Sequence, residues 1–492
     1  MDNSILVNAN SKEIIKEVLF QENCEVNAEQ DVKVLGASAR SRVTGCESLN
    51  GEFRVNVKTT FNVLKRSADG NYFTEQAETE SSHTIANEAV LSTTKAVLRA
   101  SVTECSVNVG STTVKCKATV EICGWFVKER AINYLNAGTP GIYCKSCETK
   151  IENVLPITDN KVTLTFTDET RMPLAQIIDF CGYVSIGSVY PASGSYRLDG
   201  DVNFRLTAIT DNGQFLTQSF SHPFTADCMD ENITSDMHLD MEGVLKNLSF
   251  TITESDKRIV VSDVSLTIYG IGIEEKEVNG VCDVYCTTNE IKVESSTQTV
   301  NSHFCLRSLR EKATATVSVG SVSEVLTVTN PMLSVTGTRN ADGVSIEGIV
   351  QTTVVYMDGD DIKSCEAEIP YVSTIGADYV CESIFAPEVT VTAINARPRG
   401  GSEIEINVEL FVVVRGVRTT ETVVIGGLEF GEKKEEDDFA ISLYIVKPNE
   451  TLWEVAKALN TDEATLTEQN SDIELPLKGG EKIILYKQLN VD

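Results

Sequence analysis

Two pairs of cysteines have a spacing at which thiolates bind zinc. Cys144 and Cys147 form a CxxC motif, and Cys282 and Cys286 form a CxxxC motif. A structural zinc site needs four ligands, which usually come as two well-spaced pairs. These pairs lie far apart in the sequence, and the four histidines lie near neither of them: His83, His222, His238 and His303. We therefore expect structural thiols and no metal site.

Hydrolytic and phosphoryl-transfer chemistry also lacks its usual residues. A Ser-His-Asp or Cys-His site needs a histidine or another base beside the nucleophile, and the four histidines are scattered over predicted strands and loops. The sequence has no glycine-rich phosphate loop followed by Lys-Ser or Lys-Thr. Paired carboxylates carry no signal in a chain with 72 acidic residues. We expect a non-enzymatic protein that uses no cofactor.

The overall charge argues against nucleic acid and anionic membranes as partners. The 492 residues include 42 basic and 72 acidic ones, a formal charge of −30, and such a chain repels phosphates. A basic protein surface is a more natural partner, although the acidity could equally serve solubility alone. The N-terminus lacks the pattern of a secretory signal, and no apolar run is long enough to span a membrane. We expect a cytosolic protein, in which thiols stay reduced.

The elements that would position any site repeat along the chain. The segments that begin at Phe53, Tyr196 and Val344 each alternate apolar and polar residues, which is the period of a half-buried strand. Their starting residues lie 143 and 148 positions apart. Each segment ends in a pair that suits a tight hairpin because both residues tolerate positive φ. The pairs are Asp69-Gly70, Asn212-Gly213 and Asp358-Gly359.

Two further matches have nearly the same period. Three glycines that end similar apolar segments lie 146 residues apart: Gly124, Gly270 and Gly416. The stretch IYCKSCETKIENV, from Ile142, also matches VYCTTNEIKVESS, from Val284. This match places Cys144 and Cys286 at equivalent positions of a predicted strand, which favours a structural role for both thiols.

We predict a mainly β chain with three tandem β-sandwich or open-barrel repeats, at residues 1–155, 156–298 and 299–430. Two helices are expected in the first repeat. Asn10 would cap one of them, with Glu13 completing a capping box and an apolar face made of Ile14, Ile15, Val18 and Leu19. The other would cover residues 85–99, where a strand is the alternative. The charged segment 431–441 predicts an acidic, flexible linker.

The C-terminal residues 442–488 predict a small α+β unit. Thr451 is expected to cap a helix, with Glu454 completing a capping box. Asp462 is expected to cap a second helix, and a closing strand follows at residues 482–487. The predicted order is strand, helix, helix, strand. The helices would bury an apolar stripe that consists of Leu452, Val455, Ala456, Leu459 and Leu466.

This unit resembles the LysM domain. The family's Tyr-x-Val opening corresponds to Tyr444 and Val446, its Gly-Asp-Thr-Leu loop to residues 449–452, and its LxxxN motif to Leu466 and Asn470. Here an asparagine replaces the loop glycine and a glutamate replaces the aspartate. LysM domains commonly bind N-acetylglucosamine polymers between two loops. The resemblance therefore implies a groove formed by Asn449, Glu450, Thr451, Asn470, Ser471, Asp472 and Ile473.

Trp453 lies off the predicted apolar stripe and is a further candidate for contact with a glycan or a protein. Two interpretations remain open for its indole ring. It presents an aromatic face to a partner, or it folds over the terminal strand of the unit.

The order of three β repeats, an acidic linker and a LysM domain resembles the SipL family of clostridial spore-coat morphogenetic proteins. The strand at 281–294 and the hairpin at 345–359 are similar to parts of that family's SPOCS domain. The resemblance implies an adaptor in the mother-cell cytoplasm, at the forespore surface and in the spore coat. Its LysM domain would bind a SpoIVA-type scaffold, and other coat proteins are further possible partners.

Two alternatives belong to other classes. One is an envelope protein whose LysM domain binds peptidoglycan or other N-acetylglucosamine polymers. The other is a self-assembling coat subunit that uses exposed strand edges.

Overall fold

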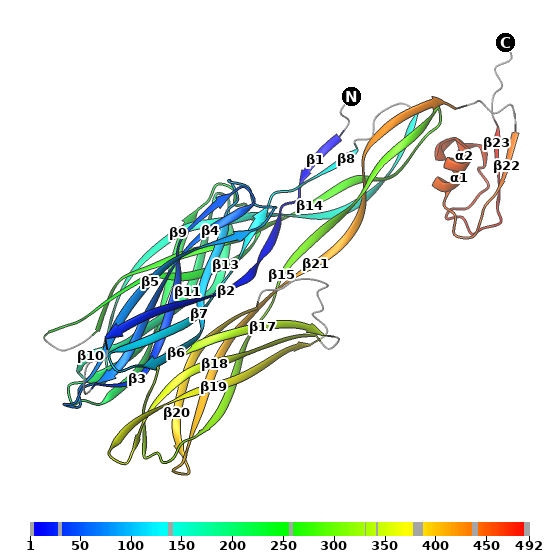
Figure 1. The fold of residues 1–492 in the computed structure, drawn as a ribbon. Helices are drawn as coiled ribbons and strands as arrows, with labels where there is room; N and C mark the ends of the chain where they lie inside the picture. The colour runs from blue at the N-terminus through cyan, green and yellow to red at the C-terminus, as the bar shows by residue number, and fades with distance from the viewer. Residues whose placement is uncertain are drawn as a thin grey trace.

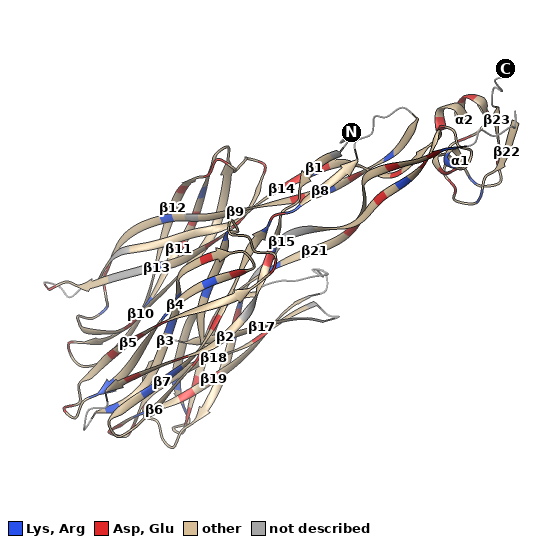
Figure 2. Ribbon diagram, turned by 45° about the horizontal axis from the view of Figure 1, so that its top comes forward, with Lys and Arg blue, Asp and Glu red and all other residues tan. Residues whose placement is uncertain are grey.

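The computed structural model describes residues 4–27, 32–135, 141–254, 259–329, 331–340, 343–376, 387–434 and 441–486. The described residues are mainly β, with two short helices near the C-terminus. Sheet-rich cores gather at one end of the molecule, and long strands run from them to the small helical unit (Figure 1). Acidic residues occur on the cores, along these long strands and on the helical unit (Figure 2). Neither described helix is long and apolar enough to cross a bilayer.

The first core lies between two antiparallel sheets of three strands each. One sheet has the order β2 (Ser11–Asn27), β7 (Thr113–Lys128), β6 (Ala96–Val109). The other has the order β3 (Lys33–Leu49), β4 (Glu52–Arg66), β5 (Tyr72–Ala86). Alternate side chains of both sheets are buried in one cluster, as period-two strands require. Within it, the rings of Phe53 and Phe126 meet edge to face, with centroids 5.5 Å apart.

The second core has the same construction. One of its sheets has the order β10 (Leu174–Ala192), β11 (Ser195–Thr210), β12 (Phe215–Met229). The other has the order β13 (His238–Ile252), β14 (Ile259–Cys286), β9 (Ile142–Asp168). The two sheets share one apolar cluster, in which Phe180 and Phe204 stack with centroids 5.5 Å apart.

The third core follows the same plan with one extra strand. One sheet has the order β15 (Asn289–Ser318), β21 (Glu403–Lys433), β20 (Pro387–Arg399). In the other, β18 (Gly343–Asp358) pairs with β16 (Glu324–Val328), β17 (Met332–Asn340) and β19 (Asp361–Gly376). The glycines of the three predicted turns follow β4, β11 and β18. They have positive φ, as expected: Gly70 at 85°, Gly213 at 76° and Gly359 at 63°.

Both helices predicted in the first repeat are wrong. Residues 11–27 form β2, which pairs with β7 along its length, and the side chain of Asn10 accepts a hydrogen bond from the amide of Arg130. After a bulge that follows Ile15, the half-buried Val18, Phe20 and Cys24 fall on one face of the strand. The first apolar residues of β2 have a helical spacing, but the rest of the segment alternates with the period of a strand, and the whole segment forms a strand. Residues 87–95 are turns between β5 and β6, which begins at residue 96.

Four long strands extend beyond the second and third cores and form a stalk, defined by residues 142–154, 273–286, 289–300 and 420–433 (Figure 1). β9 pairs with β14, and β15 pairs with β21. The two ladders pack together through the buried side chains of Val281, Val284 and Ile425. Two short strands, β1 (Ser4–Asn8) and β8 (Ala131–Leu135), pair beside the stalk. Residues 431–433 of the predicted linker belong to β21, and residues 435–440 lie outside the described part of the chain.

Charged side chains from all three cores meet in one partly buried ion cluster, in which Glu242 is buried and its partners are half-buried. Arg99 on β6 pairs with Glu242 on β13 and lies 2.9 Å from Glu388 on β20. Arg415 on β21 lies 3.2 Å from both glutamates and 2.6 Å from Asp240. Burial disfavours the charge of Glu388, but the two arginines outweigh it and lower its pKa to about 2. Burial raises the pKa of the Glu242 carboxyl, against the pull of Arg99. The cluster joins the three cores through paired charges.

Candidate binding site

The C-terminal unit, which we call the cap (residues 441–486), has the predicted order of elements. It consists of β22 (Ile441–Ile445), α1 (Leu452–Ala458), α2 (Glu463–Gln469) and β23 (Lys482–Tyr486). β22 and β23 pair antiparallel, and the helices pack against them. Val455, Ala456 and Leu466 are buried, as the apolar stripe predicts, while Leu452 and Leu459 are half-buried.

Both helix starts in the cap follow the predicted chemistry. The Glu454 carboxylate accepts a hydrogen bond from the Thr451 amide at 2.7 Å, and the Thr451 hydroxyl accepts one from the Glu454 amide at 3.4 Å. This capping box satisfies two amides that the helix itself leaves unpaired. Asp462 caps α2 by accepting a hydrogen bond from the Thr465 amide at 2.7 Å. The two short helices are therefore fixed at their N-termini.

The predicted groove lies between the loop of residues 446–451 and the loop of residues 471–481. The two loops are joined by backbone hydrogen bonds, from Val446 to the Glu481 carbonyl at 2.9 Å and from Gly480 to the Val446 carbonyl at 2.8 Å. A side chain at Gly479 would come within 2.9 Å of the Pro448 Cα, so only glycine lets the loops approach this closely. Asn449 holds a φ of 66°, the left-handed conformation expected where the family has glycine.

Glu450 shapes the first loop. One of its carboxylate oxygens accepts a hydrogen bond from the Tyr444 hydroxyl at 2.6 Å, and the other accepts one from the Lys447 amide at 2.8 Å. The bond from Tyr444 is the main reason that the pKa of Glu450 lies below its usual value. Because both oxygens are engaged, the longer carboxylate at this position holds the loop together.

Asn470 is a structural residue and not an open part of the groove. Its side chain is buried, donates to the Leu466 and Ile484 carbonyls at 2.8 Å each, and accepts from the Ile484 amide at 2.8 Å. Both the nitrogen and the oxygen of the amide are therefore used, in one hydrogen bond to α2 itself and two that tie the end of α2 to β23. The other predicted groove residues divide by exposure. Asn449, Thr451, Ser471 and Asp472 are exposed, while Glu450 and Ile473 are half-buried.

Trp453 is buried in one apolar cluster with Ile483 and Leu485 of β23, so the interpretation that it presents an aromatic face to a partner is wrong. Its ring packs edge to face on Tyr285 of the stalk, with centroids 4.9 Å apart, and it does not present a free aromatic face. Its indole nitrogen donates a hydrogen bond to the Asp283 carboxylate at 2.7 Å. Lys457, one turn further along α1, donates to the same carboxylate at 2.7 Å. The tryptophan therefore fastens the cap to its own chain.

The tip of the stalk forms a seat for the cap, which consists of Tyr143, Asp283 and Tyr285. The two tyrosine rings stack with centroids 5.2 Å apart. The Tyr285 hydroxyl donates to the Thr461 carbonyl at 2.7 Å, and the rings join the apolar cluster of the cap. The cap therefore ends the stalk as a docked unit (Figure 1).

Polar contacts extend the seat around the turn between α1 and α2. Asn460, at a φ of 53°, donates to the Thr287 carbonyl at 2.8 Å. Its side-chain oxygen accepts from Lys434, which also donates to the Cys286 carbonyl at 2.8 Å. Burial opposes the charge of Asp283, but hydrogen bonds from Lys457 and Trp453 lower its pKa below the usual value. The seat is thus favoured by an ionised Asp283.

The sequence already contained a signal for the seat. The matched stretches IYC and VYC align Tyr143 with Tyr285 as well as Cys144 with Cys286. Because Ile142 pairs with Cys286 and Tyr143 with Tyr285, the repeat places both tyrosines at the same level of one ladder. Asp283 had no comparable signal, since it is one of many acidic residues.

The prediction that all cysteines are free thiols is wrong for one member of each spaced pair. Cys147 and Cys282 form a disulfide between β9 and β14, across a sequence separation of 135 residues. Cys282 lies at a bulge between Val281 and Asp283, directly before the seat. Among the described residues, Cys144 and Cys286 remain free. The long antiparallel ladder brings the two motifs together, which their distance in sequence concealed.

Two histidines have polar partners of the kind found in hydrolases, but in separate cores. His83 lies 2.9 Å from the Ser81 hydroxyl on β5, and His222 on β12 lies 2.9 Å from the Asp168 carboxylate on β9. The serine and the aspartate therefore do not meet at one histidine.

Residues 444–477 match the LysM domain family. The chain therefore carries a LysM domain in the cap. No curated protein matches the chain, and no solved structure matches it.

Proposed function

We propose that this chain is a non-enzymatic binding protein whose LysM domain binds N-acetylglucosamine-containing glycan, such as peptidoglycan, at the end of a rigid β stalk. The observation that carries the proposal is the division of the cap's surface. Trp453 is buried against the stalk, whereas Asn449, Thr451, Ser471 and Asp472 of the groove stay exposed. Docking therefore leaves the family's glycan-binding loops accessible.

The composition of the groove suits a neutral, hydroxyl-rich polymer. Its exposed side chains are an amide, two hydroxyls and one carboxylate, which supply donors and acceptors for sugar hydroxyl and acetamido groups. The loops are fixed by backbone hydrogen bonds and by Glu450, so little ordering remains to oppose binding.

For the rest of the chain we propose three tandem β-sandwich repeats of the SPOCS type. Three cores built from paired sheets support this, as does the recurrence of the turn glycines after β4, β11 and β18. In this proposal the sandwiches and the stalk set the distance between the LysM domain and whatever the cores contact.

A second candidate is the spore-coat adaptor, located at the forespore surface of the mother cell and bound to a SpoIVA-type scaffold. One observation favours a protein partner for the cap. Ile441, Leu443 and Ile445 occupy alternate positions of β22 and are each at least 60% exposed, and Tyr486 is exposed opposite Ile441. A row of exposed apolar side chains on one small strand is typical of a protein interface.

Binding of the full chain to chitin oligosaccharides, measured by calorimetry, tests the two candidates together. We expect binding by the wild-type chain, about tenfold weaker binding by a variant with Ser471→Ala and Asp472→Ala, and unchanged binding by Leu443→Ser. Leu443→Ser is the matched control because it alters the same domain outside the groove.

The opposite pattern would favour the adaptor. No measurable binding to chitin or peptidoglycan, together with capture of a SpoIVA-type scaffold that Leu443→Ser abolishes, would overturn the glycan proposal.

A further inference from the structure

A large cavity opens where the three cores meet, at a distance in the chain from the LysM domain and independent of the function proposed for it. Its volume is about 1830 Å³, and residues of all three cores line it. Small-molecule pockets usually measure roughly 300–1,000 Å³. The size therefore suits a segment of polymer better than a metabolite.

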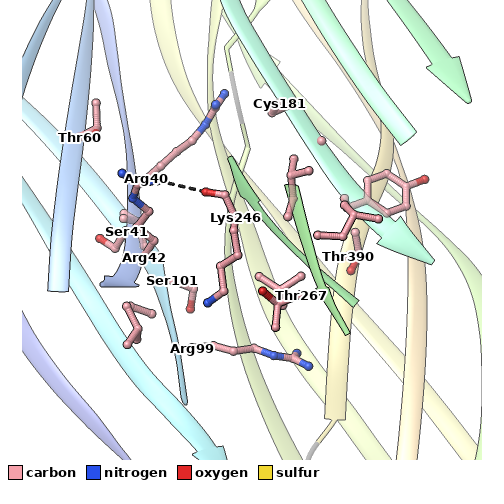
Figure 3. A pocket seen from close by; sticks show the side chains of 18 of the residues that line it. Arg40, Ser41, Arg42, Thr60, Arg99, Ser101, Cys181, Lys246, Thr267 and Thr390 are labelled. Atoms are coloured by element: carbon pink, nitrogen blue, oxygen red, sulfur yellow. Dashed lines mark hydrogen bonds between the residues drawn. The ribbon is translucent and has the colours of Figure 1, made fainter. Parts of the chain in front are cut away.

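The residues that line this cavity carry a net positive charge, whereas the chain as a whole is strongly negative. Three acidic residues line it, Glu121, Asp179 and Glu388, against eight basic ones, an excess of five positive charges (8 − 3) in a chain of formal charge −30. Figure 3 shows Arg42, Arg99 and Lys246 reaching into the same space from different strands. The basic residues are Arg40, Arg42, Lys58, Lys95, Arg99, Lys161, Arg205 and Lys246.

The acidic groups of the lining already have partners. Asp179 pairs with Arg40, and Glu388 pairs with Arg99 in the ion cluster that joins the cores. Arg42 instead donates to a backbone carbonyl, that of Lys246, at 3.1 Å (Figure 3). Lys161 is exposed, and no ion pair involves it among the described residues. Arg40, Lys58 and Arg99 face carboxylates, and Arg205 and Lys246 have partners of their own. The positive charge that remains for an anionic ligand includes that of Arg42 and Lys161.

Most of the strands that line the cavity are edges of their sheets. Nine strands contribute consecutive lining residues, and two of them, β11 and β14, are central. Within the described chain the other seven pair with a neighbour on one side only: β3, β6, β10, β12, β13, β17 and β20. Such edges carry unpaired backbone donors and acceptors that an added strand can satisfy. Bulges interrupt most of them, but the pairing of β3 with β4 is regular from Gly36 to Val43.

The regular part of β3 also has an incomplete row of charges. Glu80, Lys58 and Arg42 lie directly opposite one another across β5, β4 and β3. Lys58 lies 3.9 Å from Glu80 of this row and 2.7 Å from the neighbouring Glu78. The row therefore runs acid, base, base and ends at the open edge. Like charges directly opposite each other are unfavourable, and opposite charges are favourable. A carboxylate on the next strand position would balance Arg42.

We propose that this cavity binds an extended acidic peptide segment of a partner protein, which adds to the β3 edge and places its carboxylates toward Arg42 and Lys161. A free phosphate or a nucleic acid fits less well. The cationic groups are spread along several strands instead of converging on one point, and the acidic exterior repels a long polyanion. Only a short acidic stretch gains from the cavity without approaching the rest of the chain.

A labelled peptide of alternating glutamate and valine serves as the probe, with fluorescence anisotropy of the full chain as the readout. We expect saturable binding that weakens with salt, and no binding of the matched lysine–valine peptide. The variants Arg42→Glu and Lys161→Glu, made singly and together, should each weaken binding about tenfold or more. Lys117→Glu is the control, because Lys117 is an exposed lysine on β7 outside the cavity.

Strand addition requires free amides on the peptide, so the same sequence with alternate backbone nitrogens methylated should fail to bind. Because Lys161 is exposed, the circular dichroism spectrum of the Lys161→Glu variant should match that of the wild-type chain. This variant therefore tests the proposal even if Arg42→Glu fails to fold. Equal effects of Lys117→Glu and Lys161→Glu would overturn the proposal. So would equal binding of the methylated peptide, or displacement by inorganic polyphosphate as effective as by the peptide, because either result describes a general anion site.

Discussion

The indole nitrogen of Trp453 donates a 2.7 Å hydrogen bond to Asp283, a residue 170 positions earlier at the tip of the stalk. The contact links an α-helix of the LysM domain to the end of β14, beside the stacked Tyr143 and Tyr285 rings. A LysM domain of this size buries little apolar surface by itself. Packing on the stalk therefore supplies part of its stability and fixes its direction.

The first prediction concerns this contact. Asp283→Ala should loosen the cap, because Trp453 and Lys457 both lose their acceptor, at about 1–2 kcal/mol of docking free energy. The readout is Trp453 fluorescence in a chain that carries Trp125→Phe, which leaves Trp453 as the single tryptophan, and every variant is compared with that chain. We expect the emission to shift to longer wavelength. Glu277→Ala, at an exposed position of β14, should leave it unchanged.

The second prediction is a pH dependence of the same contact. The pKa of Asp283 is lowered in the folded chain, so its contribution is complete above the unfolded value of about 3.9 and is lost as pH falls through the lower folded value. Acid titration of the Trp125→Phe chain should therefore release Trp453 below about pH 4. Asp283→Asn should remove this transition. An identical acid transition in that variant would show that another carboxylate controls docking.

Local chemistry made much of the cap predictable. The capping residues Thr451, Glu454 and Asp462 act within one turn of themselves, and so a single sequence is enough to place them. The turn glycines were predictable for the same reason, since positive φ is a property of one residue.

Contacts between distant segments were not predictable in this way. The apolar stripe of the cap leaves Trp453 outside the predicted core. The residue that it packs against, Tyr285, belongs to another part of the chain. The Cys147–Cys282 disulfide depends likewise on the register of a ladder that the sequence does not specify. The helix predicted near Ile15 failed because pairing of the whole of β2 with β7 outweighs a short helical spacing of apolar residues, and Leu19 of the predicted apolar face is exposed.

The third prediction separates structure from binding inside the groove. Asn470→Ala removes two hydrogen bonds that tie the end of α2 to β23 and one to the Leu466 carbonyl of α2, and it leaves the Ile484 amide unpaired. The cap should therefore lose about 2–3 kcal/mol. Its thermal unfolding, followed by Trp453 fluorescence, should shift to lower temperature. Asp472→Ala, at an exposed position two residues away, should keep the unfolding temperature and weaken glycan binding. Equal unfolding temperatures for both variants would contradict the structural role of Asn470.

The fourth prediction concerns the Cys147–Cys282 disulfide. Thiol titration of the denatured chain should give two fewer thiols before reduction than after it. A crosslink across 135 residues stabilises the fold by about 4–5 kcal/mol in the chain-entropy model. Reduction, or Cys147→Ser, should therefore lower the denaturation midpoint. Because Cys282 directly precedes Asp283, the loss should also shift Trp453 emission. Cys144→Ser alters a free thiol on the same strand and should do neither.

The last prediction tests whether the partly buried ion cluster holds the three cores together. Glu242 lies on β13 of the second core and contacts Arg99 of the first and Arg415 of the third. Glu242→Ala leaves two arginines in a partly buried site with one carboxylate fewer. Breaking a fully buried pair from one side costs about 3–5 kcal/mol, and the partial exposure of the two arginines should lower the loss to about 3 kcal/mol or less. Denaturant unfolding should therefore begin at lower concentration, and hydrogen exchange should rise on β6, β13 and β20 together. Glu277→Ala removes an exposed carboxylate that lies 3.8 Å from Lys150, and it should change neither measurement. Faster exchange confined to β13 would mean that the cores are held by their other contacts and that the ion cluster stabilises only its own strand.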